Sequence, residues 1–221
     1  MIWFTADEHY GHENARTGWP DRVTGTPSAT PRPFGSQKDM IDGLIAAHNA
    51  VVKDGDDVWH IGDMFWRTLT TRQCIDIVKR LNGRHWYVRG NHEEAMEPEY
   101  GVRQLFGAVY ERKELRFASS ELMAWKAGEP RPKKAEQLVV LDHYAGRVWN
   151  GCHRGSWQLF GHSHGVLSNV GLRQMDVGVD ANGFAPVSLE KVAEFMRVRP
   201  ATPGYAVWGR PFRANNPDGA L

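Results

Sequence analysis

The stretch Ile2-Trp3-Phe4-Thr5-Ala6-Asp7-Glu8-His9 sets the pattern on which the fold depends, because a short apolar run ends abruptly in a polar cluster. Two later stretches repeat the pattern: residues 58–61 precede Gly62-Asp63, and residues 85–89 precede Gly90-Asn91-His92. Short β-prone runs separated by helical patterns predict βαβ units and a mostly parallel sheet. Because the carboxyl ends of parallel strands share one edge of a sheet, we expect the three polar clusters to meet there.

Two helices are predicted between these strands, and a third follows near the end of the chain. The first begins after Ser36 as N-cap, the second ends at Asn82-Gly83, and the third spans residues 189–198 with Ser188 as N-cap. Apolar residues recur at helical spacing in the first two: Met40, Ile41, Leu44 and Ile45, then Cys74, Ile75, Val78 and Leu81. Both helices are expected to cover the sheet.

The remaining segments predict a second sheet and two irregular regions. Further short runs, at residues 147–149, 157–160, 166–170 and 174–177, indicate a sheet that is more antiparallel than the first. Proline and glycine concentrate in residues 17–35, which predicts a surface loop that forms one wall of the site.

Residues 111–141 are densely charged, and we expect a hairpin there, with its tip at Gly128-Glu129-Pro130-Arg131-Pro132 and its second arm at residues 137–141. A solvated hairpin is preferred over contact with a polyanionic substrate. Residues 1–199 are expected to form one domain, and residues 200–221, which lack periodicity, a C-terminal tail.

Composition limits the classes of partner. Among 221 residues, the 27 Lys and Arg nearly balance the 26 Asp and Glu, so no global field favours nucleic acid or an anionic membrane. The apolar start is too short for a signal peptide, and no run approaches the roughly 18 to 20 apolar residues of a membrane span. Cys74 and Cys152 form no disulfide framework. We therefore expect a cytoplasmic protein without a membrane partner, and the oligomeric state stays open.

Histidines later in the chain complete a set of metal-binding side chains. Gly161-His162-Ser163-His164 places two imidazoles at alternate positions, which point the same way on an extended segment, and His143 stands alone before them. Taken singly, each cluster also suits an ordinary turn or a packed histidine. Together with Asp7, His9, Asp63 and Asn91 they favour a metal site. Imidazole, carboxylate and amide oxygen suit borderline divalent ions better than calcium.

This set resembles the calcineurin-like metallophosphoesterase superfamily, whose blocks D-x-H, G-D, G-N-H-D/E, a lone H and G-H-x-H all occur here in that order. The form Asp-x-His-x-Gly-His and the segments around residues 149–153 and 155–157 resemble a small bacterial and phage branch. In that branch Pro and Met follow the lone His-Tyr, whereas this chain has Ala145-Gly146. The resemblance covers residues 2–187. It implies an α/β fold of two facing mixed β-sheets flanked by helices, a four-layer β-sandwich.

The resemblance also implies roles for individual residues. Asp7, His9 and His164 would hold one divalent transition-metal ion, and Asn91, His143 and His162 a second, with Asp63 bridging them. Manganese is the first choice, with nickel, cobalt, iron or zinc as alternatives. His92, outside the ligand set, would act as general acid or stabilise charge in the transition state, and its alternative is a packing histidine. A hydroxide that bridges the metals would attack phosphorus in line.

Other side chains are weaker candidates. His12, Arg147 and His153 are close enough in sequence to the motifs to contact substrate, each against the alternative of a surface residue. His60 is expected to be a buried histidine bonded to backbone. Trp66, Trp149 and Trp157 could stack on a base, although core packing is preferred for them.

The function predicted first is a phosphodiesterase acting on a small nucleotide-like or cyclic phosphodiester. The alternatives are a phosphomonoesterase, such as a nucleotide or protein phosphatase, and a metal-holding interaction scaffold without turnover, against which His92 argues. A nuclease is disfavoured by the balanced charge and by the lack of an evident nucleic-acid-binding module.

Overall fold

The computed structural model describes residues 1–19, 31–97, 101–118, 122, 136–167 and 173–199. Its first sheet has the order β4-β3-β2-β1-β9. The three sequence stretches that end in polar clusters form β1 (Ile2–Thr5), β2 (Asp57–Ile61) and β3 (Arg84–Val88), which pair in parallel as predicted. The parallel β4 (Val109–Tyr110) and the antiparallel β9 (Val187–Ser188) flank them.

The second sheet has the order β5-β6-β7-β8 and is also mixed, with one antiparallel pair of three against one of four in the first sheet. Only β5 (Lys113–Ala118) and β6 (Glu136–Leu141) are antiparallel, and they are the two arms of the predicted hairpin, whose tip lies outside the described residues. β7 (Trp157–Phe160) runs parallel to β6 and to β8 (Gln174–Asp176). The parallel pairing matters, because it brings the carboxyl ends of β6 and β7 to one edge.

One of the predicted strands does not form, and most of another lies outside the described part of the chain. Residues 147–149 lie in an irregular segment, and residues 166–167 follow a turn, while residues 168–172 lie outside the described part of the chain. Gly146 explains part of the irregularity. Its backbone N–H donates to Gln158 Oε1 and its carbonyl accepts from Gln174 Nε2, so this segment lies along β7 and β8 without joining their sheet. A Cβ at Gly146 would lie 2.9 Å from the Val148 carbonyl, which is how Ala145-Gly146 shapes this loop.

The helices begin where the sequence predicts. α2 (Gln37–Val51) and α5 (Leu189–Arg197) start after Ser36 and Ser188, whose hydroxyls accept backbone N–H groups as N-caps. α3 (Thr71–Val78) starts with a capping box at Thr70 and ends four residues before the predicted Asn82. A short α1 (Glu13–Thr17) lies inside the first loop. Within the described ranges, no helix has the length and apolarity to cross a membrane.

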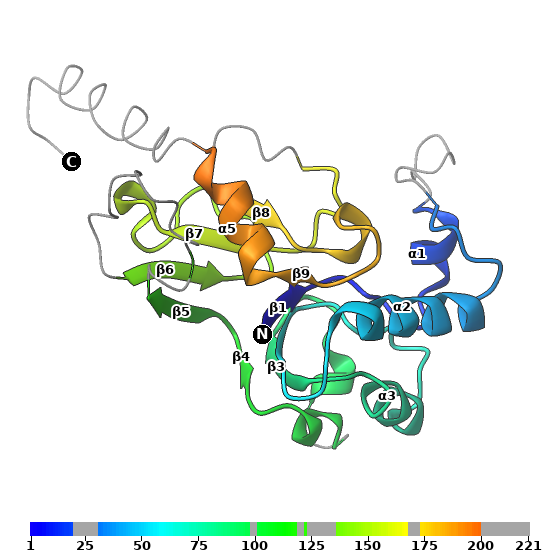
Figure 1. The fold of residues 1–221 in the computed structure, drawn as a ribbon. Coiled ribbons are helices and arrows are strands. Elements are labelled where there is room, and N and C mark those ends of the chain that lie inside the picture. Colours follow the sequence, from blue (N-terminus) through cyan, green and yellow to red (C-terminus); the bar gives the residue numbers. More distant parts are fainter. Residues whose placement is uncertain (20–30, 98–100, 119–121, 123–135, 168–172, 200–221) are drawn as a thin grey trace, which may run out of the picture.

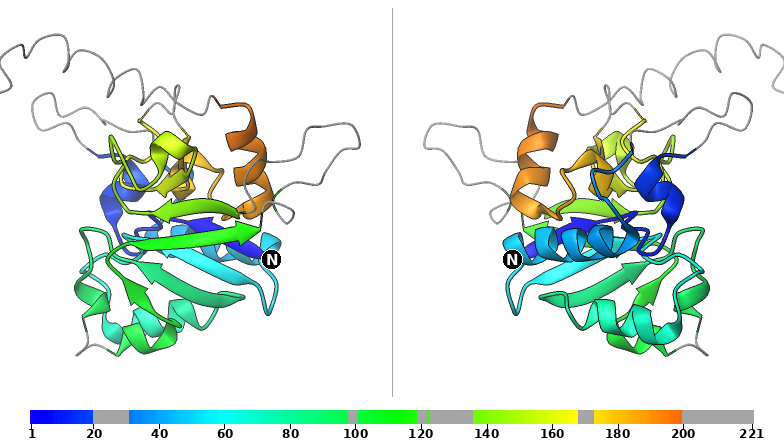
Figure 2. Two further views of the ribbon diagram at one scale, coloured as in Figure 1. Left: turned by 90° about the vertical axis from the view of Figure 1, so that its left-hand side faces the viewer. Right: turned by 90° about the vertical axis from the view of Figure 1, so that its right-hand side faces the viewer.

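Figures 1 and 2 show the stacked layers, and the two largest apolar clusters of the described residues pack between them. Between the sheets, Phe4 and Ile61 of the first pack against Leu141 and Leu159 of the second, all with no exposed surface. On the outer face of the first sheet, α2 and α3 form the other core around the ring of Tyr87. α5 lies on the opposite side of the molecule from α3 and packs against β1, β8 and β9. The chain thus forms two facing mixed sheets flanked by helices, as predicted.

Candidate metal centre

The candidate ligands gather where strands of both sheets end. Asp7 and His9 follow β1, Asp63 follows β2 and Asn91 follows β3 in the first sheet, while the second sheet supplies the remaining three from the ends of β6 and β7. These three are His143, His162 and His164. The arrangement follows from parallel pairing, since parallel strands carry all their following loops at one edge.

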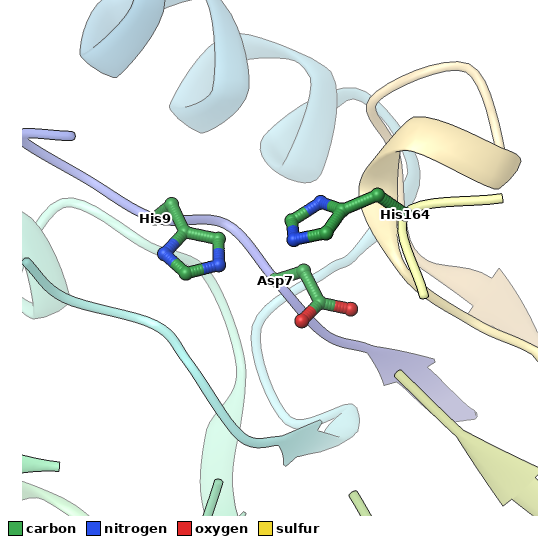
Figure 3. Close-up of side chains that lie close together, drawn as sticks. All are labelled: Asp7, His9 and His164. Carbon is green, nitrogen blue, oxygen red and sulfur yellow. The ribbon is translucent and has the colours of Figure 1, made fainter. Parts of the chain in front are cut away.

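The first ligand group consists of Asp7, His9 and His164, whose donor atoms all lie within 4.8 Å of one another. Figure 3 shows the carboxylate of Asp7 and the two imidazoles turned toward one another, with His164 arriving on a separate loop. Asp7 and His9 are almost fully buried. His164 Nδ1 lies 2.7 Å from Asp180 Oδ2, a hydrogen bond that fixes the imidazole and leaves Nε2 free for a metal.

The second ligand group consists of Asp63, His143 and His162, again with donor atoms within 4.8 Å. His143 Nδ1 donates to the carbonyl of Ile61 at 2.8 Å, so its Nε2 faces the group, where Asn91 Oδ1 lies 3.2 Å away. Asn91, His143 and His162, which the sequence assigns to a second ion, therefore lie close to one another.

Asp63 stands between the two groups. Its Oδ2 lies 3.4 Å from Nε2 of His143 and 3.7 Å from Nε2 of His9, one histidine from each group. Its Oδ1 accepts the backbone N–H groups of Asn91 and His92, both at 2.9 Å, which orients the carboxylate. One carboxylate is thus shared geometrically by both sets of imidazoles.

The backbone at the ligands is unusual. Asp7, His9, Asp63, His162 and His164 all have positive φ, between 47° and 66°, a region that costs most non-glycine residues free energy and that persists at functional sites. Glycines beside them leave room for the carboxylates. A Cβ at Gly90 would contact Asp63 Oδ1, and one at Gly161 would lie 2.5 Å from Asp7 Oδ2. These glycines explain the Gly-Asn-His and Gly-His-x-His spacing.

The electrostatics of the site match a bound cation. Burial raises the pKa of Asp7 to about 7, although the charges of His164 and His143 act to lower it. Both ring nitrogens of His9 are buried without a hydrogen-bond partner, and burial lowers its pKa well below its ordinary value. A divalent ion would supply a partner to His9 and positive charge beside the Asp7 carboxylate. The donor set of imidazole, carboxylate and amide fits a borderline divalent metal.

His143 and Asp63 form a charged pair in the metal-free protein. Burial acts to lower the pKa of His143, but its hydrogen bond to Asp63 and the charges of Asp7 and Asp63 outweigh burial and raise it to about 9. Burial acts to raise the pKa of Asp63. The hydrogen bond and the charge of His143 outweigh burial and hold the pKa of Asp63 below its ordinary range. Metal binding at this group would therefore displace a proton from His143.

Aromatic side chains stand around the first group, including two predicted candidates. His12 is buried and stacks on Trp66, with ring centres 3.6 Å apart and planes at 8°. His92 is half-buried, its ring centre 4.6 Å from that of Trp66 and 5.7 Å from that of His9. Trp19 lies 4.2 Å from His164 between ring centres. The structure thus places His12, His92 and Trp66 at the site and adds Trp19 as a wall.

Other predicted contacts are not placed there. His153 lies on the 3-10 turn Cys152–Arg154, which precedes β7, whereas His162 follows β7, so His153 belongs to the opposite edge of the sheet. Arg147 is exposed in the segment alongside the middle of β7. Trp149 and Trp157 are buried in the core, which agrees with the prediction that they pack there and do not stack on a base. Nearness to His143 in sequence was misleading, because the chain doubles back along the sheet after Tyr144.

Several supporting residues were missed by sequence reasoning. Arg32 and Asp180 hold the first group, and Asp176 Oδ2 accepts from the hydroxyl of Ser163 and the N–H of Gly165, fixing the loop between His162 and His164. Glu93 Oε1 accepts the backbone N–H groups of Asp63 and Gly90, and burial raises its pKa to about 7. Only Glu93, inside the Gly-Asn-His-Glu block, carried a signal in the sequence.

A second set of missed contacts involves Tyr144 and His60. The Tyr144 hydroxyl lies 3.3 Å from Asn91 Oδ1 and its ring 4.7 Å from that of His162, which places it beside the second group. His60 is buried as predicted, but it bonds to side chains and not to backbone. Its Nδ1 pairs with Glu8 Oε1 at 2.7 Å and its Nε2 with His85 Nδ1 at 3.0 Å.

Comparisons with known proteins agree with this architecture. The family model of the calcineurin-like phosphoesterases matches residues 1–166. An uncharacterized protein of Methanocaldococcus jannaschii is 28% identical over 93 residues, which are 42% of this chain and 47% of the relative, so the match spans about half of that relative's length. The crystal structure of a protein of unknown function from Aquifex aeolicus aligns with a TM-score of 0.57 and 18% identity, covering 88% of this chain and 98% of that one.

The Aquifex likeness shows the fold alone, whereas the family model covers well over half of the chain and includes all the motif blocks described above. Its members are metal-dependent hydrolases of phosphoester bonds, which agrees with the two candidate ligand groups. The chain belongs to the calcineurin-like phosphoesterase family.

Proposed function

We propose that the chain is a phosphodiesterase that uses two divalent transition-metal ions, with manganese as first choice. Asp7, His9 and His164 hold one ion and Asn91, His143 and His162 the other, with Asp63 as the shared ligand. The observation that carries this proposal is the position of Asp63 Oδ2, within 3.4 Å of His143 Nε2 and 3.7 Å of His9 Nε2. A carboxylate in this position reduces the repulsion between two cations.

The bound ions would supply a water of lowered pKa and would neutralise charge on the phosphate oxygens. The chain itself supplies orientation and a proton. His92 is half-buried, lies beside His9 and is not one of the metal ligands. It protonates the departing oxygen. His12 stacks on Trp66 next to it, and burial lowers the pKa of His12 to about 4, so His12 is a neutral hydrogen-bonding group at physiological pH.

The diester preference rests on what surrounds the ligands. Trp19, Trp66 and Tyr144 present rings beside the two groups, while the buried guanidinium of Arg32 points to Asp180 and to backbone carbonyls. A phosphodiester carries one negative charge and a second organic arm, so rings with little added positive charge suit it better than a dianionic monoester.

Metal dependence is the first test. Chelator-treated protein should be inactive, and manganese, nickel or cobalt should restore hydrolysis better than magnesium or calcium, because imidazole-rich sites favour borderline ions. Asp63→Asn keeps the shape of the shared ligand but removes its charge, and it should lose most of the turnover. Full activity of the chelated protein, or normal turnover and two bound ions in Asp63→Asn, would reject the binuclear proposal.

Substrate class needs a paired assay. Bis(p-nitrophenyl) phosphate should have a higher kcat/KM than p-nitrophenyl phosphate under the same metal, and Trp66→Leu should remove the advantage of bis(p-nitrophenyl) phosphate over methyl p-nitrophenyl phosphate. The first pair differs in charge and in the second arm together, whereas the second pair differs only in the second arm. A preference for the monoester with both metal groups filled would favour the phosphomonoesterase instead.

A further inference from the structure

Arg32 is a buried cation that contacts the loop of Asp7 and His9 directly and reaches His164 through Asp180. Its side chain is 1% exposed, although it belongs to the proline-rich segment predicted to be a surface loop. Three of its nitrogens donate four hydrogen bonds shorter than 3 Å, two to backbone carbonyls in the loop of Asp7 and His9 and two to the carboxylate of Asp180. Paired in this way, the planar guanidinium of Arg32 is held in one orientation among its partners.

One edge of the guanidinium pairs with Asp180. Nε and Nη2 donate to Oδ1 and Oδ2, each at 2.7 Å, the bidentate geometry that a planar guanidinium allows. Asp180 Oδ2 also receives Nδ1 of His164 at 2.7 Å. Arg32 thus fixes the carboxylate that orients His164.

The other side of the guanidinium holds the loop after β1. Nη1 donates to the carbonyl of Glu8 and Nη2 to that of Asp7, both at 2.7 Å. Asp7 and His9, on either side of Glu8, have φ of 58° and 49°, and His164 has φ of 47°. Backbone in this region persists only where its surroundings fix it, and for these loops Arg32 is part of those surroundings.

We infer that Arg32 and Asp180 are positioning residues for the first metal ion, joining the loop of Asp7 and His9 to the loop of His164. This inference rests on the proposed function, because it assumes that the group binds a metal. Neither residue touches the reacting atoms. Partners that orient metal ligands change metal affinity by about 10- to 100-fold when removed. Lysine at position 32 supplies a point charge but not the fork, so it should replace arginine only in part.

Arg16 provides a control that separates the proposed role of Arg32 from a purely structural role of this segment. Arg16 also forms an ion pair, with Glu13, and its Nη1 donates to the carbonyls of Phe34 and Gly35 at 3.1 and 3.4 Å. It anchors the same segment as Arg32 but makes no contact of this kind with a ligand loop. Arg16→Gln therefore loosens the segment and leaves the link to His164 intact.

The experiment measures manganese binding, not turnover. Metal-free wild type, Arg32→Gln, Arg32→Lys, Asp180→Asn and Arg16→Gln are titrated with Mn²⁺ by calorimetry. Arg32→Gln and Asp180→Asn should weaken one of the two ions by about 10- to 100-fold and leave the other nearly unchanged, while Arg32→Lys is intermediate and Arg16→Gln matches wild type. Hydrolysis by the weakened variants should recover when Mn²⁺ is raised.

The double variant of Arg32→Gln with Asp180→Asn adds a stricter condition. The affinity of the double variant for Mn²⁺ should equal that of whichever single variant binds Mn²⁺ more weakly, because both changes break the same link. If Arg32→Gln fails to fold by circular dichroism, Arg32→Lys and Asp180→Asn decide the matter. Unchanged Mn²⁺ affinity in the folded variants, or an equal loss in Arg16→Gln, overturns the inference while leaving the proposed function in place. Wild type that binds no Mn²⁺ overturns the proposed function itself.

Discussion

At the scale of single residues, the backbone of the site is as specific as its side chains. Five of the six non-glycine residues with positive φ in the described part of the chain are candidate ligands, and the sixth is Phe184. Three of these ligands, Asp63, His162 and His164, lie next to a glycine in the sequence. The geometry of the metal groups is therefore set partly by residues that donate no atom to them.

Gly90→Ala should abolish binding of metal at Asp63 without changing any donor atom. The new Cβ would contact Asp63 Oδ1 and lie 2.9 Å from the backbone nitrogen of Asp63, so the shared carboxylate must move. Gly55→Ala is the control. At Gly55, φ is 87° and nothing lies within 4 Å of the new Cβ, so alanine there should lower stability by about 1–2 kcal/mol and spare the metals. Metal content and thermal unfolding separate the two effects.

Should Gly90→Ala keep a full complement of metal, close packing around Asp63 would have no part in building the site.

His92→Ala should keep its metals and lose rate. A general acid contributes about 10²- to 10⁴-fold, and the loss should be larger for alkoxide leaving groups, which need a proton, than for nitrophenolate, which departs readily. Steady-state kinetics on matched alkyl and nitrophenyl diesters, with metal analysis, provide the measurement. Equal losses on both would assign His92 to binding or attack in place of proton donation.

At the scale of elements, a row of buried histidines lies beneath the site. His60 on β2 links Glu8 to His85 on β3, and His48 on α2 stacks near His60 with ring centres 6.3 Å apart. Burial lowers the pKa of His48 to about 4 and that of His85 to about 3, from 6.5. The packing of α2 on the sheet thus favours the neutral form of His48 and His85.

Acid should therefore loosen the packing of α2. Because the folded-state pKa values lie below the ordinary 6.5, the unfolded chain takes up protons first as pH falls. The contribution of these histidines is intact above pH 6.5 and declines as pH drops toward 4, by on the order of 1 kcal/mol per pH unit for each histidine. Urea unfolding of metal-free protein measures this slope.

His48→Gln, which can still donate to the Asn82 carbonyl that His48 Nε2 meets at 2.9 Å, should flatten the slope. His153→Gln, at an exposed position, should leave it unchanged. A slope that is the same in wild type and His48→Gln would show that this histidine does not titrate on unfolding.

What the sequence could predict follows the range of the interactions. The strands β1, β2 and β3 and the caps of α2 and α5 depend on local pattern and were predicted well. The pairing of β7 with β6 and β8 depends on which strands meet, so the local pattern predicted a more antiparallel second sheet but not that β7 runs parallel to both neighbours. Ligand positions followed from the motif blocks, whereas Arg32 and Asp180 pair across 148 positions of sequence, which no local pattern indicates.

At the scale of the whole molecule, the metal groups join the two sheets. Each group takes donors from the loops of both sheets, so bound metal should resist their separation. Saturating Mn²⁺ at about a hundred times its Kd should stabilise the fold by about 2.7 kcal/mol for each ion that binds only the folded state. Thermal unfolding with and without Mn²⁺, with Mg²⁺ at equal ionic strength as control, measures the gain.

Asp63→Asn should show a smaller gain, because its affinity for metal is reduced. An unfolding temperature that does not respond to Mn²⁺ at concentrations that restore hydrolysis would mean that the ions do not connect the sheets.

The mixed origin of each ligand group also bears on how the protein is made. Asp7, His9, Asp63 and Asn91 leave the ribosome early, yet neither group is complete until the residues after β7 arrive, at His162 and His164. A growing or truncated chain that ends before His162 has only incomplete donor sets and should bind metal weakly. Metal binding at both groups would then require a chain that extends at least to His164.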